Sequence, residues 1–120
     1  MLRAQLKSIE CFDVDLTTYS GEEDGSIGLE LTLYIGEFSS KEAEVFNVFV
    51  CSSDWLEKYE NKPRLILNTI LVSKFDLKEI ENLINNYLMH CSGNTWEEMA
   101  YKISKAFSWG FDNYQELKNP

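Results

Sequence analysis

The chain lacks several features that would assign it to a familiar class at once. It has no apolar run near the ~20 residues that a membrane-spanning helix requires. Its start, MLRAQLKSIE, lacks the apolar block of a signal peptide. Its three cysteines, Cys11, Cys51 and Cys91, are an odd number, which fits a reducing compartment better than a disulfide framework. We therefore expect a cytoplasmic protein that has no membrane partner.

Residue types that carry catalysis or bind metals are also scarce. The single histidine, His90, stands near the end of a predicted helix, where a solvated or capping role is favoured over that of a general base. A zinc site built from His90 and the cysteines is conceivable, but the chain has no C-x-x-C pair, and a small buried apolar role explains each cysteine more simply. Asp13 and Asp15 could take part in acid–base or metal chemistry, although a turn-forming pair is the simpler interpretation. Since the glycines form neither a phosphate-binding loop nor a G-x-S-x-G elbow, we expect no catalytic centre, no metal and no cofactor.

Basic residues are few, and their distribution is uneven. The chain has 11 Lys and Arg against 20 Asp and Glu, a net charge of −9. Residues 1–60 hold 13 acids and 4 bases, whereas residues 61–120 hold 7 of each, so the whole imbalance lies in the first half. An acidic surface repels nucleic acid, and we expect no direct binding of DNA or RNA. The same surface would attract a basic protein, although solubility alone also explains a net charge of this size.

What the sequence does contain is a pattern of strands followed by helices. With 120 residues, of which 44% are apolar, residues 1–120 can form one domain with a single core. Alternating or continuous apolar residues predict strands over 2–12, 27–35, 43–51 and 64–75, and the apolar phase slips at Ser8 and Ile9, which indicates a bulge in the first strand. The strand over 43–51 is apolar on both faces, so we expect it to be central.

Helix signals come between and after these strands. Ser53 or Asp54 can cap a short helix that ends before residues 61–63, and longer helices are predicted near 76–91 and 95–108. Asp76 caps the first of these two, and Gly93 is placed to follow it in a left-handed conformation. Thr95 and Glu98 form a capping box, in which the Glu98 carboxylate is expected to return to the Thr95 amide. The order predicts an α+β fold: a mainly antiparallel four-stranded sheet with two C-terminal helices packed on one face.

Four short motifs along the chain give a family resemblance. They are Asp13-Val14-Asp15, Val50-Cys51-Ser52-Ser53-Asp54-Trp55-Leu56, Thr95-Trp96-Glu97-Glu98 and Trp109-Gly110-Phe111-Asp112-Asn113-Tyr114. In this order and spacing they resemble the immunity protein 8 family of bacterial polymorphic-toxin and contact-dependent inhibition systems. The resemblance implies a non-enzymatic protein that binds and neutralises a cognate toxin domain. The matching aromatic residues look structural, so we expect Trp55, Leu56, Trp96 and Tyr114 to belong to the core.

The charge distribution and the resemblance together suggest where such a partner binds. We expect a basic toxin domain of the nuclease type to contact two acidic regions of the first half. One consists of Glu22, Glu23 and Asp24 in the connection over 13–26, and the other of Asp54, Glu57 and Glu60 in the short helix. Solvated surfaces without a partner would look the same in sequence. The aromatic tail from residue 107 to 114, which can close the core or add a short edge strand, is the next candidate for the partner surface.

A second function hypothesis comes from a different class of protein. The chain could be a small cytosolic adaptor or ligand-binding domain without catalytic activity, which would use an apolar pocket beneath the two C-terminal helices. A toxin-like open reading frame immediately upstream would distinguish the immunity protein from this alternative.

Overall fold

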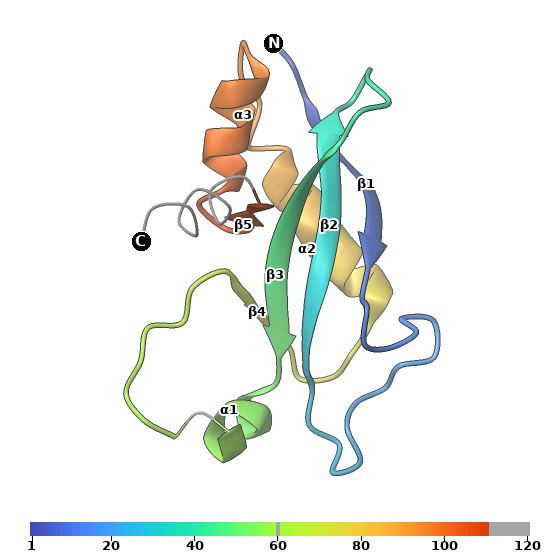
Figure 1. Ribbon diagram of the computed structural model, residues 1–120, viewed down its shortest axis with the longest axis vertical. Helices are drawn as coiled ribbons and strands as arrows, with labels where there is room; N and C mark the ends of the chain where they lie inside the picture. The colour runs from blue at the N-terminus through green and yellow to red at the C-terminus, as the bar shows by residue number, and fades with distance from the viewer. Residues whose placement is uncertain (60, 111–120) are drawn as a thin grey trace.

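The computed structural model describes residues 1–59 and 61–110, which form an α+β fold around one sheet (Figure 1). Its strands are β1 (Ala4–Glu10), β2 (Gly28–Glu37), β3 (Glu44–Cys51), β4 (Thr69–Leu71) and β5 (Ser108–Trp109). The first four lie in the order β1-β2-β3-β4, and β5 pairs with β3 as well. The β1–β2, β2–β3 and β3–β5 pairs are antiparallel, but β4 runs parallel to β3. The predicted fold class is therefore confirmed: the sheet is mixed but mainly antiparallel, since only one of these four pairings is parallel.

The first strand contains the irregularity that its apolar phase predicts. The register of β1 against β2 shifts between Leu6 and Ser8, so that Leu6 lies opposite Ile35 and Ile9 lies opposite Leu33. A bulge lets both apolar side chains reach the same partner face, even though they are three positions apart in a period-2 element.

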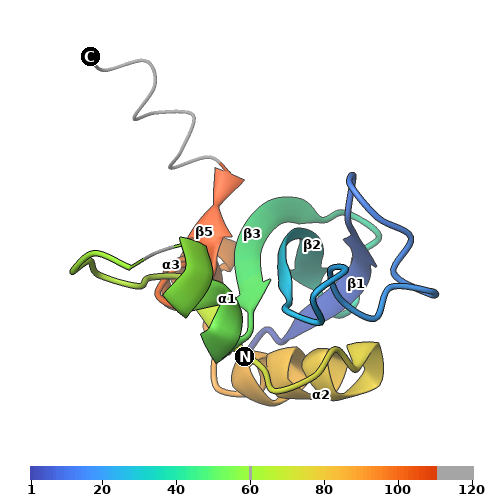
Figure 2. The same cartoon turned by 90° about the horizontal axis from the view of Figure 1, so that it is seen from below.

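One face of the sheet holds the core. The alternating residues of β2 lie opposite the apolar residues of β3, and the fully or nearly fully buried set is Leu29, Leu31, Leu33, Ile35, Phe46, Val48 and Val50. Two helices, α2 (Leu77–Leu88) and α3 (Trp96–Ile103), bury their apolar stripes against this face. Figure 2 shows α2 lying along one side of the sheet beneath β1 and β2. Burial of apolar surface, which contributes about 25 cal/mol per Å², is the main source of the stability of the fold.

The opposite face of β2 and β3 is polar and aromatic. Glu30 and Phe49 are cross-strand neighbours there, and Glu30 is exposed. The short helix α1 (Ser53–Tyr59) follows β3 at the end of the sheet and places Trp55 against Phe49. This face therefore lies outside the main core and presents polar and aromatic side chains.

The predicted strand over 64–75 is wrong for most of its length. Only Thr69–Leu71 is a strand, and Asn68, at φ +52°, breaks the extended backbone just before it. The parallel register pairs Thr69 with Phe49, so residue 67 would extend β4 opposite Asn47. That position is taken, because β5 pairs Ser108 with Asn47 and Trp109 with Phe46. Two segments thus compete for one edge of β3, and residues 64–67 are left outside the sheet.

The joint between α2 and α3 follows the prediction in part. Asp76 caps α2 by accepting from the Glu79 amide at 3.2 Å, and the Thr95 hydroxyl accepts from the Glu98 amide at 3.1 Å, both as expected. The Glu98 carboxylate, however, accepts from the amide of Asn94 at 2.7 Å and not from that of Thr95. The return bond of the capping box is thus shifted by one residue.

Gly93 is not in the left-handed conformation that its position suggests. Positive φ among the described glycines occurs at Gly21 and Gly25. Gly93 instead forms an isolated antiparallel bridge with Leu2, whose amide donates to the Gly93 carbonyl at 2.7 Å. A Cβ at this position would come within 2.9 Å of the Glu98 Cβ. Glycine is therefore needed here for close approach and not for backbone freedom.

Candidate partner-binding surface

The two predicted acidic regions lie at the same end of the sheet. Figure 1 shows the connection between β1 and β2 reaching this end, beside α1. The Lys58 ammonium of α1 lies 2.5 Å from an Asp24 carboxylate oxygen and so joins the two regions directly. Residues that are far apart in sequence are in this way brought onto one surface, whereas Glu60 lies outside the described residues.

Two of the predicted carboxylates have structural roles on this surface. Asp24 binds Lys58 and also accepts from the Ser26 amide at 2.9 Å and the Ser26 hydroxyl at 2.6 Å. These hydrogen bonds hold the pKa of the Asp24 carboxyl well below its usual range, and the bond from Lys58 has the largest effect. Asp54 accepts from the Trp55 amide at 2.9 Å and from the Ser52 hydroxyl, at the start of α1. Both side chains fix the local backbone.

The other three described carboxylates are free to meet a partner. Glu22, Glu23 and Glu57 are exposed, and within residues 1–59 and 61–110 their carboxylates make no side-chain hydrogen bond or ion pair. Exposed carboxylates without partners act through their field and chiefly raise the rate of association with a positively charged surface.

An apolar groove lies beside these carboxylates. It has a volume of about 250 Å³ and is lined by Phe49, Trp55, Leu56, Arg64, Leu65, Ile66, Leu67 and Thr69. The side chains of Leu65, Ile66 and Leu67 are 82%, 52% and 70% exposed. Three consecutive large aliphatic residues are thus displayed next to α1, and the sequence-based interpretation of residues 64–75 as a buried strand missed them.

The wall of the groove is a group of aromatic rings. The Trp55 ring lies 4.9 Å from that of Phe49 and 5.1 Å from that of Tyr59, measured between centroids. Trp55 and Leu56 are half-buried, and Tyr59 is 53% exposed, so these residues border the groove and lie outside the core predicted for Trp55 and Leu56. A Cβ on Gly28 would come within 2.2 Å of the Trp55 indole nitrogen, so this glycine provides the seat for the ring.

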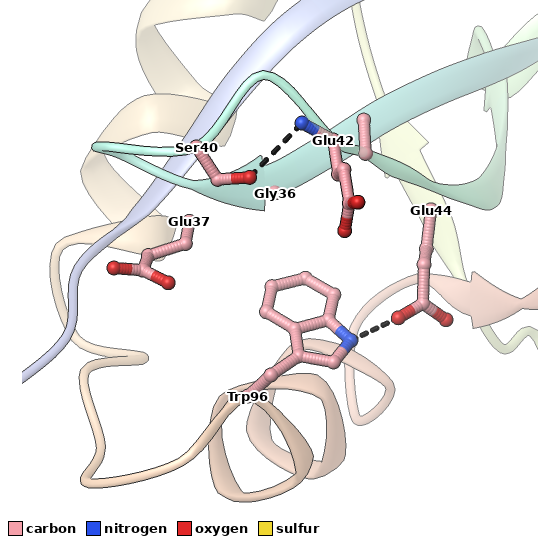
Figure 3. A pocket seen from close by; sticks show the side chains of 7 residues that line it. Gly36, Glu37, Ser40, Glu42, Glu44 and Trp96 are labelled. Carbon is pink, nitrogen blue, oxygen red and sulfur yellow. Dashed lines mark hydrogen bonds between the residues drawn. The ribbon is translucent and has the colours of Figure 1, made fainter.

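A second pocket lies at the other end of β2 and β3, near their hairpin. Its volume is about 440 Å³, and its lining consists of Gly36, Glu37, Ser40, Glu42, Ala43, Glu44 and Trp96 (Figure 3). One oxygen of Glu44 accepts from the Trp96 indole, as Figure 3 shows, and the other accepts from the Trp109 indole at 3.0 Å. A single carboxylate therefore connects β3, α3 and β5, and this gives the half-buried Trp96 a structural role.

The remaining candidates for chemistry are accounted for locally. Asp15 accepts from the Thr17 hydroxyl at 2.6 Å and the Thr17 amide at 2.9 Å, which lowers its pKa and confirms the turn-forming role predicted for it. Cys51 and Cys91 are buried, and burial raises the pKa of both thiols. His90 is exposed. Within the part of the chain that the structure describes, no three or more His, Cys, Asp or Glu side chains converge on a possible metal position. Nor does any described helix have the length and apolar character to cross a bilayer.

The fold and these surfaces define a small α+β domain with an acidic surface beside an exposed apolar groove. The family model for immunity protein 8 matches residues 4–114, and the chain belongs to the immunity protein 8 family. The chain matches no curated protein and no solved structure.

Proposed function

We propose that the chain is a non-enzymatic immunity protein that binds and neutralises a cognate toxin domain in the cytoplasm. The observation that carries the proposal is the family match over residues 4–114, which includes both acidic regions and the apolar groove. The local roles found for Asp15, Cys51 and Cys91 support inhibition by binding over catalysis.

The charge distribution supports a basic partner, of which a nuclease-type toxin domain is the best candidate. Surfaces that bind nucleic acid carry clustered lysine and arginine, which contact phosphates. A protein of net charge −9 with exposed, unpaired glutamates can occupy such a surface in place of the nucleic acid. The proposed partner-binding surface consists of Glu22, Glu23, Asp24, Asp54, Glu57 and Glu60. Glu22, Glu23 and Glu57 make direct contacts, Asp24 and Asp54 hold the two regions in place, and Glu60 is included from the sequence alone.

The first test is whether the open reading frame immediately upstream encodes a toxin-like domain, and that domain is then used as the partner. Cells that express this domain should survive only when the chain is co-expressed, and the two purified proteins should form a complex whose affinity falls as salt is raised. Survival of cells in the absence of the chain, or lack of a complex between the purified proteins, would contradict the proposal.

The alternative of a ligand-binding domain with a pocket beneath the helices receives no support from the structure. Leu33, Ile84 and Ile103, from β2, α2 and α3, are completely buried and belong to the hydrophobic core.

A further inference from the structure

We propose that the groove between α1 and residues 64–67 is an anchor site, which receives one apolar side chain of the toxin domain presented from a basic surface. This inference rests on the proposed function and deepens it, because it adds an apolar contact to a surface that sequence reasoning described only by its charge.

The first argument is the exposure of the aliphatic residues. Leu65, Ile66 and Leu67 are consecutive, exposed and line one groove, and larger exposed apolar patches on a folded domain mark interaction sites. They cannot gain stability by joining the sheet, because β5 occupies the edge of β3 that their register would require. Among the residues that the structure describes, their apolar surface therefore stays exposed and open to a partner.

The second argument is the shape and rigidity of the groove. Its volume of about 250 Å³ lies below the roughly 300–1,000 Å³ of small-molecule sites, so it fits one side chain better than a cofactor or metabolite. The Trp55 ring is held by Phe49, by Tyr59 and by the backbone at Gly28. A pre-ordered tryptophan beside a pocket is the kind of residue that dominates binding energy at protein interfaces.

The third argument is charge complementarity around the groove. The elements that frame it carry six described acids, Glu22, Glu23, Asp24, Glu30, Asp54 and Glu57, against three bases, Lys58, Lys62 and Arg64. Lys58 and Asp24 pair with each other, so this pair leaves the excess of three negative charges unchanged. The surroundings therefore favour an apolar side chain flanked by lysine or arginine. They disfavour a second copy of this chain, which would bring another net charge of −9 to the same surface.

The experiment separates the anchor from the charged surroundings by kinetics. The full chain is measured against the upstream-encoded toxin domain as wild type, as the double variant Leu65→Ala/Leu67→Ala, and as the control Phe38→Ala. Phe38 is 63% exposed on the β2–β3 hairpin, at the opposite end of the sheet. The double variant should raise the dissociation rate at least about tenfold, with the association rate changed by less than about twofold. Phe38→Ala should change neither rate.

Because the substituted side chains are exposed, the melting temperature of all variants should stay at the wild-type value, so that an affinity loss reports on the interface. If the toxin domain binds and the groove variants dissociate at the wild-type rate, the anchor is refuted while the proposed function stands. If the wild-type chain does not bind the toxin domain, both are refuted. If light scattering shows a dimer of the chain that Leu65→Ala/Leu67→Ala abolishes, the occupant of the groove is a second copy and the proposal is wrong.

Discussion

Thr95 is a residue whose polar side chain has a purely local role. Its hydroxyl accepts from the Glu98 amide at the start of α3, where the first amides of a helix have no partner within the helix. Thr95→Ala should lower the free energy of unfolding by ~1 kcal/mol, measured by urea denaturation, and leave the affinity for the toxin domain unchanged. A large loss of affinity at unchanged stability would place Thr95 in the interface.

Asp24 gives the acidic surface a defined pH dependence. Its folded-state pKa lies below the ordinary value of 3.8, chiefly because Lys58 donates to it, so its contribution to stability is complete above that ordinary value and is lost as the pH falls through the folded-state pKa. The pKa of Lys58 is raised by the same pair, so Lys58 stays protonated throughout this range.

The measurement is the difference in melting temperature between wild type and Asp24→Asn as a function of pH. The difference should be constant from neutral pH to about pH 5 and should shrink towards zero in more acidic solution. Ser26→Ala, which removes one hydroxyl donor to Asp24 and keeps the ion pair, should show a smaller difference with the same pH profile. A difference that stays constant below pH 3 would contradict the ionic origin of the effect.

Among the secondary-structure elements, α1 and the β1–β2 connection are expected to control association with the partner. Variants of Asp24 or Asp54 would disturb the local structure, so the sharper test neutralises Glu22, Glu23 and Glu57 together with glutamine. This triple variant should slow association and weaken its dependence on salt, because exposed charges at an interface act mainly on the on-rate. The dissociation rate should change little.

The matched control removes the same charge from other elements, with Glu42, Glu79 and Glu97 changed to glutamine; all three are exposed. If the control slows association as much as the test variant does, the effect comes from net charge and not from the proposed surface.

The elements also show which structural features can be predicted from local sequence patterns. The bulge in β1, the cap of α2 and the capping interaction at Thr95 were predictable, since each depends on residues within a few positions of one another. The strand over 64–75 was not predicted correctly, because its length is decided by Ser108 and Trp109, which take the edge of β3 from a distant part of the chain. Hydrophobic periodicity and β-propensity do not indicate which of two segments will pair with the edge of β3.

At the scale of the whole molecule, the sequence predicted the α+β class and the acidic half, but it did not reveal that the two acidic regions share one end of the sheet. Their proximity follows from the antiparallel pairing of β2 and β3, which places Gly28 opposite Cys51, and the ion pair between Asp24 and Lys58, 34 positions apart, joins the two regions there. The groove beside them was missed for a different reason: the sequence pattern predicted a strand that contained Leu65, Ile66 and Leu67. The role of Glu60 and the core position expected for Tyr114 concern residues outside those described.

The shared edge of β3 also affects the order in which the strands can pair during synthesis. A ribosome makes residues 64–71 well before Ser108 and Trp109, so for part of synthesis the edge at Phe46 and Asn47 has no β5 beside it. During that interval an extended Asn68 would let the aliphatic segment continue β4 along β3, in the register that Thr69 and Phe49 already define. The arrival of the last described strand closes this alternative. The exposed groove of the finished protein thus depends on which of two segments holds the edge when the chain is complete.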